Sequence, residues 1–438
     1  MVSLTFCARK TGSLTCSVLA FFVLDRVDGD EKVWNRFRGP NGSGISHAKT
    51  VPATWQERDY NWTVRIPGVG YGSPVVWDDR IYVTSGNEDT GERQLYCLNV
   101  SDGQIRWQRK YPGMTYYQHR DNAYAASTPA ADAEGVVFSW ATPDRVMLVA
   151  LDPSGKERWR RDFGPYKGLH GGAVSPIIVN GLVVLPNDQM HPDRFPGYAS
   201  GPAGKSFLIA VDRRTGNTRW MIERTSTLAG YSIPSLHRYE GGEELIFTGT
   251  SHGITAVNPL TGAVNWELPD VFPDRCVGSP ISADGLVLAG FGYGLRGTRF
   301  LAVRPLRDGT TIRPIIVHDV KKSVPLVPSA LAKDGRLYLW TDAGVVTCLE
   351  LSTGELHWRE RVGGQFYSSP VWIDGRVYGV SRDGKVVVLA ASADFELLSE
   401  VDLGEPFSST PAIADDVMYL RTNYRLLSLG GTPSLEQK

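Results

Sequence analysis

The sequence predicts an all-β fold, an eight-bladed β-propeller built from four-stranded antiparallel blades. Eight times along the chain a Ser/Thr-Pro dipeptide or a close variant opens a short apolar run, and each of these units holds two or more strand-like runs. Successive prolines lie 41 to 58 residues apart, and a repeat of this length is typical of propellers rather than of stacked helices. The eight prolines are Pro74, Pro129, Pro176, Pro234, Pro280, Pro328, Pro370 and Pro411.

The unit that begins at Pro370 shows how one blade is built. Apolar and β-branched runs flank Asp374-Gly375, a dipeptide that accepts the positive φ angles of a two-residue hairpin. A second turn follows at Asp383-Gly384. Strand a therefore follows the proline, and strands b and c follow the first and the second turn. The proline suits the first position of a strand, where no N–H is needed for the ladder.

A second pattern marks the passage from strand c to strand d. It reads Ala-x-Asp-x-x-Thr-Gly-x-x-x-Trp from Ala210 to Trp220, and it recurs from Ala256 to Trp266 with Asn258 in place of the aspartate. Because the tryptophan falls in the outermost strand once per unit, we expect its ring to pack between neighbouring blades rather than to contact a ligand. The predicted structural tryptophans are Trp62, Trp107, Trp159, Trp220, Trp266 and Trp358.

The ring is predicted to close through an N-terminal strand. The unit after Pro411 supplies three strands, whereas residues 61–66 form a spare strand that carries Trp62. Pairing the two would complete the eighth blade and remove exposed edges. The predicted organisation is a signal or leader segment at 1–30, a lead-in at 31–60, one propeller domain at 61–431 and a tail at 432–438.

Composition narrows the class of protein. The chain has 438 residues, 42% of them hydrophobic, and a closed repeat makes them one large domain. The net charge is −1 and no basic patch or nucleic-acid motif is present, so no nucleic-acid partner is predicted. Arg9 and Lys10 precede an apolar stretch at 14–24, which predicts a signal peptide and export to the periplasm or cell envelope.

The five cysteines predict no metal site, because neither a Cys-x-x-Cys motif nor a Cys/His zinc spacing occurs. Cys97 and Cys348 occupy strand-c positions and are predicted to be small core residues. Cys276 is predicted to lie on a loop.

Insertions concentrate on one face of the predicted ring. The a–b and c–d turns emerge on one side, which we call the short-turn face; the b–c loops and d–a links emerge on the other, which we call the looped face. The looped face takes the insertions at 111–126, 164–174, 187–205, 269–278 and 291–299. Such loops on a rigid scaffold commonly carry function.

The candidate binding residues are the polar side chains of these loops. The alternative is that they cap one another and the strand ends, as buried backbone requires. The candidates are His119, Arg120, Asp121, Asn122, His170, Asp188, Asp274, Arg275, Arg296 and Arg382.

The pattern from Ala210 to Trp220 and its copies resemble the tryptophan docking repeat of PQQ-binding-like (pyrroloquinoline quinone) eight-bladed propellers, over residues 60–430 or so. The opening from Trp34 to Gly44 is similar to the lead-in of such proteins of the planctomycete type. That family includes quinoprotein alcohol dehydrogenases and the non-enzymatic outer-membrane assembly lipoprotein BamB. The resemblance therefore implies a fold more specifically than a function.

The chain departs from the dehydrogenases in two ways: it has no vicinal cysteine pair, and their Ca²⁺ ligand set does not map onto it. We therefore expect a non-catalytic, BamB-like envelope scaffold, without a cofactor, that binds a protein or peptide at the looped face. Membrane association would come through a partner or an uncleaved leader. The alternative is a PQQ- or metal-dependent oxidoreductase holding PQQ and Ca²⁺. In it, Asp121, Asp188 or Asp274 would act as general base, and Arg275 or Arg296 would hold quinone oxygens.

Overall fold

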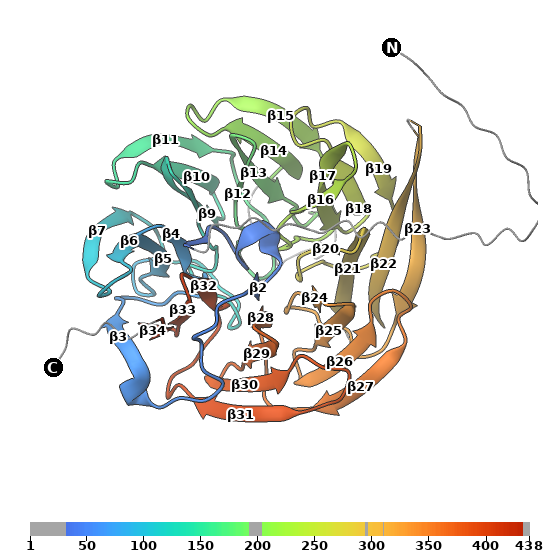
Figure 1. Cartoon of the computed structure of the whole chain (residues 1–438). Coiled ribbons are helices and arrows are strands. Elements are labelled where there is room, and N and C mark those ends of the chain that lie inside the picture. Colours follow the sequence, from blue (N-terminus) through green and yellow to red (C-terminus); the bar gives the residue numbers. More distant parts are fainter. Residues whose placement is uncertain (1–31, 192–203, 294–296, 310, 432–438) are drawn as a thin grey trace, which may run out of the picture.

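The predicted ring of eight blades is present in the computed structural model, which describes residues 32–191, 204–293, 297–309 and 311–431 (Figure 1). In each blade, strand a lies at the centre of the ring and strand d at the rim. All neighbouring strands within the four-stranded blades are antiparallel, which confirms the predicted fold class. The predicted leader and tail lie outside the described residues.

The first four blades follow one another along the chain. Blade 1 is β4 (Val75–Trp77), β5 (Arg80–Gly86), β6 (Arg93–Asn99) and β7 (Ile105–Tyr111), and blade 2 is β8 (Ala130–Asp132), β9 (Gly135–Thr142), β10 (Arg145–Leu151) and β11 (Glu157–Asp162). Blade 3 is β12 (Ile177–Val179), β13 (Leu182–Asn187), β14 (Phe207–Asp212) and β15 (Thr218–Glu223), and blade 4 is β16 (Ser235–Tyr239), β17 (Gly242–Gly249), β18 (Gly253–Val257) and β19 (Val264–Leu268).

The remaining blades complete the circle. Blade 5 is β20 (Ile281–Ala283), β21 (Leu286–Tyr293), β22 (Gly297–Asp308) and β23 (Thr311–Val320), and blade 6 is β24 (Leu331–Lys333), β25 (Arg336–Trp340), β26 (Val345–Glu350) and β27 (Leu356–Arg361). Blade 7 is β28 (Val371–Ile373), β29 (Arg376–Val380), β30 (Lys385–Ala390) and β31 (Leu397–Asp402), and blade 8 is β32 (Ala412–Ala414), β33 (Val417–Arg421), β34 (Arg425–Gly430) and β3 (Tyr60–Arg65).

Two local features that the sequence predicts are present in the structure. Asp374 and Gly375 both have positive φ (45° and 78°), as the predicted two-residue hairpin requires. The N-terminal strand β3 pairs antiparallel with β34, with Val64 opposite Leu426. The predicted closure of the ring by the N-terminal strand is therefore confirmed.

Five of the six predicted docking tryptophans of strand d contact the c–d turn of the next blade. The Trp107 indole N–H donates to the carbonyl of Pro153 at 3.0 Å, and the ring lies on Gly155, where a Cβ would come within 2.6 Å of it. These rings therefore lie between neighbouring blades. The same hydrogen bond joins Trp62 to Val100, Trp159 to Arg213, Trp220 to Pro259 and Trp358 to Ser392.

Blade 5 changes this arrangement, which the sequence did not predict. Its c–d hairpin stays paired from Phe300 opposite Val320 out to Asp308 opposite Thr311, so it offers no short turn to the preceding blade. The Trp266 ring is buried between blades 4 and 5, but its N–H donates to Glu244 of its own blade at 2.7 Å.

His318 takes the docking role in blade 5, which has no strand-d tryptophan. Its Nε2 lies 2.9 Å from the carbonyl of Leu351 in blade 6, and a Cβ on Gly354 would come within 2.9 Å of its ring. An imidazole therefore makes the contact that an indole makes elsewhere.

A belt of hydroxyl groups joins the blades at the inner ends of the links. The residue two positions before strand a donates its backbone N–H to the hydroxyl of the corresponding residue in the next blade, at 2.9 to 3.0 Å. The bonds run from Ser73 to Thr128, Thr128 to Ser175, Ile233 to Ser279, Ser279 to Ser329, Ser329 to Ser369, Ser369 to Thr410 and Thr410 to Ser73.

The belt explains the Ser/Thr-Pro repeat and shows two departures from it. In blade 4, Ile233 stands where the others have a hydroxyl, so the joint between blades 3 and 4 lacks this bond. In blade 6, Ser329 is the belt residue and Ala330 takes the position of the proline. Pro328 is thus two residues out of register with the other seven prolines.

The lead-in crosses the centre of the ring. It contains β1 (Val33–Trp34), which extends blade 1; the short helix η1 (Pro40–Gly42); β2 (Ile45–Ser46), which pairs parallel with β28; and η2 (Glu57–Asp59), which precedes β3. In Figure 1 it is the dark blue segment at the middle of the ring.

Two side chains of the lead-in fix it to strands a of other blades. The fully buried Arg38 donates to the carbonyls of Ala330 (2.8 Å) and Pro370 (3.1 Å), and Asn41 donates to the carbonyl of Leu236 (2.8 Å). The segment thereby ties together blades 4, 6 and 7 from inside the channel. Burial lowers the pKa of Arg38 to about 9.

Candidate functional site

A charged contact on the looped face spans several blades. Asp121 comes from the link between blades 1 and 2, and Arg382 from the b–c turn of blade 7, with blades 8 and 1 between them. Arg382 Nη1 donates to Asp121 Oδ1 at 2.8 Å, and His119 Nδ1 lies 3.5 Å from Oδ2 of the same carboxylate. Burial raises the pKa of Asp121, but the hydrogen bond and charge of Arg382 outweigh it and hold that pKa below its usual range.

Two histidines meet beside this ion pair. The ring centroids of His119 and His170 are 4.1 Å apart, and the Asn122 side-chain amide donates to the carbonyl of His170 at 2.5 Å. Burial, helped by the charges of Arg275 and His119, lowers the pKa of His170 to about 4. The inserted link after β7 is therefore held against the link between blades 2 and 3 and lies near the link between blades 4 and 5.

An aromatic ring completes the cluster. The Arg382 guanidinium carbon lies 4.4 Å from the centroid of Tyr367, so the cation contacts a π face as well as a carboxylate. We call His119, Asp121, Asn122, His170, Tyr367 and Arg382 the looped-face cluster. Sequence reasoning missed Tyr367, which lies two residues before the belt residue of its own blade.

The other candidate residues do not join this cluster directly. Asp188 forms a buried two-point ion pair with Arg224 (3.2 and 3.1 Å), and the two side chains are 4% and 1% exposed. A carboxylate held in this way has no free oxygen to accept a substrate proton. This geometry disagrees with Asp188 as a general base.

Asp274 and Arg275 are also largely buried, and the Arg275 backbone N–H donates to Asp274 Oδ1 at 2.7 Å. Arg120 is 91% exposed and lies 3.9 Å from Asp121. Arg296 lies outside the described residues.

The most exposed apolar side chains of the looped face are Tyr117 (76%) and Met114 (58%), both in the link that carries Asp121. Neither was among the predicted site residues. The signal in the sequence was the presence of large apolar side chains inside a polar insertion. Exposed tyrosine and methionine beside an arginine match the composition of protein-binding surfaces.

The candidate carboxylates of the looped face do not gather into one metal-binding set. Ca²⁺ needs six to eight oxygen ligands, and within the described ranges no three His, Cys, Asp or Glu side chains gather in a way that could hold a metal ion. The candidate carboxylates are instead spread over separate ion pairs. Cys97, Cys276 and Cys348 are each buried and unbonded to one another; burial raises the pKa of the Cys276 thiol to about 12.

The family model described as outer membrane protein assembly factor BamB matches residues 118–314 and 318–398, more than half of the chain. The chain belongs to this family. BamB of Yersinia pestis is 22% identical over 300 residues, 66% of this chain and 67% of that protein. BamB of Moranella endobia is 23% identical over 257 residues, 56% of this chain and 60% of that protein.

Dehydrogenases are among the relatives as well. A polyvinylalcohol dehydrogenase of a Pseudomonas species is 24% identical over 260 residues, which is 51% of this chain but only 37% of the enzyme. The chain thus spans little more than a third of that relative's length.

Solved structures agree on the fold. BamB from Moraxella catarrhalis superposes with a TM-score of 0.57 at 15% identity, covering 86% of this chain and 98% of that one. The quinohemoprotein alcohol dehydrogenase from Comamonas testosteroni superposes with a TM-score of 0.63 at 13% identity, covering 93% and 82%. None of the described residues form a helix long and apolar enough to cross a membrane.

Proposed function

We propose that this chain is a non-catalytic scaffold of the cell envelope that binds a protein or peptide through its looped face. The observation that carries the proposal is the inserted link after β7. It presents Tyr117 and Met114 to solvent while Asp121 anchors it to Arg382 of blade 7. An apolar surface on a rigidly held loop loses little conformational entropy when a partner covers it.

The pairing of two candidate acids supports the same proposal. Asp121 is neutralised by Arg382, and the carboxylate of Asp188 by Arg224, so both acids serve structure. Membership of the BamB family supports an envelope location and a partner in outer-membrane assembly. Export through the leader at 1–30 is part of the proposal.

Site-specific photo-crosslinking tests the proposal. A photoreactive amino acid replaces Tyr117 in the full chain, expressed in its native envelope, and adducts are detected by a mobility shift and identified by mass spectrometry. The matched control places the same amino acid at Leu356, which is 52% exposed beside the c–d turn of blade 6, on the short-turn face. We expect one discrete envelope-protein adduct from position 117 and none of that mass from position 356. Identical adducts from both positions, or none from 117, would contradict the proposal.

The dehydrogenase relatives support a second candidate, a PQQ-dependent oxidoreductase. Titration of the purified chain with PQQ and Ca²⁺, followed by absorbance and thermal unfolding, separates the two. Saturable binding with a raised melting temperature would favour the oxidoreductase. Unchanged melting at high concentrations of both would favour the scaffold.

A further inference from the structure

A cleft of about 500 Å³ lies on the short-turn face, on the side of the ring opposite the looped-face cluster. Its walls are the a–b turns of blades 2 and 3 and the c–d turns of blades 3 and 4. This volume falls in the range of sites for small ligands. Six of its lining residues are Asp132, Glu134, Asp212, Arg213, Arg214 and Arg219.

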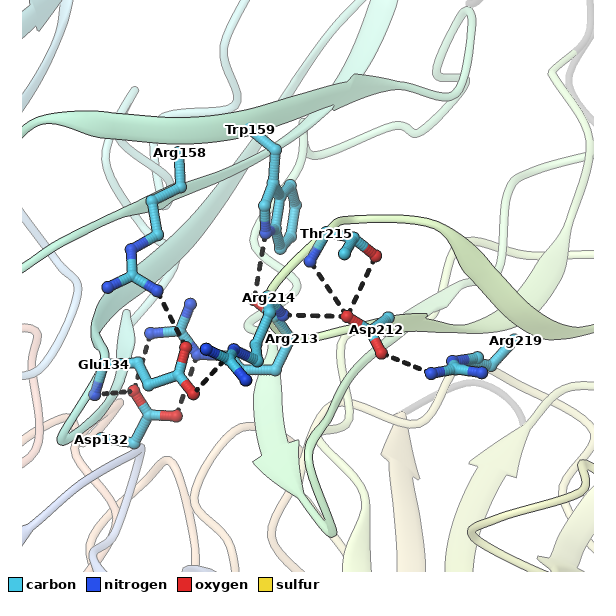
Figure 2. A network of polar contacts seen from close by, with 9 residues as sticks. All are labelled: Asp132, Glu134, Arg158, Trp159, Asp212, Arg213, Arg214, Thr215 and Arg219. Carbon is cyan, nitrogen blue, oxygen red and sulfur yellow. Dashed lines mark hydrogen bonds and ion pairs between the residues drawn. The ribbon is translucent and has the colours of Figure 1, made fainter.

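The carboxylates in and beside the cleft are already neutralised, each by its own arginine (Figure 2). Asp132 accepts two hydrogen bonds from Arg213 (2.9 and 2.7 Å), Glu134 accepts one from Arg158 (2.8 Å), and Asp212 accepts one from Arg219 (2.6 Å). Hydrogen bonds from Arg219 and Thr215 lower the pKa of Asp212 to about 2, so this carboxylate stays ionised.

Guanidinium donors remain after this pairing. The Arg213 side chain is 2% exposed, yet its Nη1 makes no hydrogen bond within the described residues, while Nε and Nη2 both bind Asp132. Arg214 is 78% exposed and lies 3.6 Å from Glu134, whose carboxylate already binds Arg158 at the shorter distance. Four arginines thus face three carboxylates, and a buried donor without an acceptor is costly.

The two charged residues at the centre of the cleft are departures from the repeat. The position of Arg213 is apolar in the other blades where the turn is short, and the position of Asp132, the last residue of strand a, carries an acid in no other blade. The apolar equivalents of Arg213 are Val100, Pro153, Pro259, Leu351 and Ala391. Both members of the Asp132–Arg213 ion pair thus differ from the residues that the repeat places there, so the repeat itself does not account for the pair.

We propose that this cleft binds a ligand through a carboxylate group, held by Arg213 Nη1 and the Arg214 guanidinium. Planar guanidinium donors match a carboxylate in geometry and charge. A purely structural role accounts for the bonds of Arg213 to Asp132, which join blades 2 and 3. A structural role does not explain why Arg213 Nη1 has no acceptor among the described residues, or why the cleft carries Arg214 as a further cation. The site is separate from the looped face and does not depend on the scaffold proposal.

Isothermal titration calorimetry of the full chain tests the site. One arm uses succinate, and the other uses a short peptide ending in two acidic residues, with its neutral amide analogue as reference. We expect saturable binding that weakens as salt is added, because exposed charges are screened. Tighter binding of the peptide identifies a chain end as the ligand, and tighter binding of succinate identifies a small acid. Absence of saturable binding of both probes up to about 10 mM, beyond a millimolar Kd, would overturn the proposal.

Three variants sharpen the test. Arg214→Gln should weaken binding about tenfold or more, whereas Arg145→Gln, an exposed arginine paired with Asp144 in the b–c turn of blade 2, should leave it unchanged. Asp132→Asn should tighten binding, because it removes the carboxylate that competes for Arg213; circular dichroism melting checks that this variant is folded. Equal weakening by Arg145→Gln and Arg214→Gln would show a nonspecific charge effect and overturn the proposal.

Discussion

His170 couples the stability of the looped face to pH. Its pKa falls from about 6.5, the ordinary value, to about 4 in the folded chain, because the ring is buried and lies near Arg275 and His119. Between these two values the unfolded chain takes up a proton that the folded chain does not. Stability should therefore fall as the pH drops from about 6.5 to about 4, and this effect should vanish above that window.

We expect His170→Gln to remove part of that pH dependence. Chemical denaturation at about pH 7.5 and about pH 5 gives the loss of unfolding free energy for each protein, and the variant should lose less than the parent. The Asp121 carboxyl has a lowered pKa, so the stability that it contributes is lost only at more acidic pH and does not obscure the comparison. Parallel losses in the two proteins would refute a role for His170.

At the scale of the element, the glycines of the c–d turns are required by the docked rings. Gly216 and Gly181 have nearly equal positive φ, 71° and 72°. A Cβ on Gly216 would come within 2.7 Å of the Trp159 ring, whereas a Cβ on Gly181 would meet nothing within 4 Å. A substitution at Gly181 therefore measures backbone strain alone, whereas one at Gly216 measures backbone strain together with the contact between blades.

Gly181→Ala should cost about 1–2 kcal/mol, the price of a left-handed backbone for an L-residue. Gly216→Ala should cost about 1–3 kcal/mol more, because the indole must move. Urea denaturation of both variants measures the difference. Equal losses would mean that the Trp159 ring shifts freely and does not hold the blades.

The hydroxyl belt makes a second prediction about contacts between elements. Ser369→Ala removes the acceptor of the buried Ser329 N–H and should destabilise the chain by about 1–3 kcal/mol. Ser369→Thr keeps a hydroxyl and serves as the control. Thermal unfolding should place the threonine variant nearer to the parent than the alanine variant; the reverse order would argue against the belt.

The same elements show why the fold could be predicted and the site only in part. Prolines, Asp-Gly turns and strand-d tryptophans act over a few residues and repeat, so the sequence displays them directly. The contact of Asp121 with Arg382 joins residues 261 apart, and no local pattern encodes which loops meet across the ring. The cleft at Arg213 was missed because its residues lie in turns that seemed uniform.

At the scale of the whole molecule, the ring is closed by contacts that are not covalent. β3 is held to blade 8 through β34 and to blade 1 through Trp62, whose indole donates to Val100 at 3.0 Å. Trp107 makes the same contact, but its strand β7 is joined to its own blade by a hairpin.

Trp62→Ala should therefore lower the melting temperature more than Trp107→Ala. It weakens the contact of β3 with blade 1, the seam at which the ring can open because no hairpin joins β3 to its own blade. Differential scanning calorimetry gives the two shifts, and limited proteolysis should cut the Trp62→Ala protein sooner near β3. Equal shifts and equal cleavage would mean that the seam is no weaker than any other joint.

The lead-in also has a consequence for the order of folding. Residues 33–65 have their partners in blades 1, 4, 6, 7 and 8, and the strand that pairs with β3 ends at Gly430. The first described part of the chain to leave the ribosome is therefore among the last to reach its native contacts. Until blade 7 begins, Arg38 lacks the carbonyl of Pro370, and until blade 8 exists β3 is an unpaired edge. The ring of this propeller can thus close only after β34 has been synthesised.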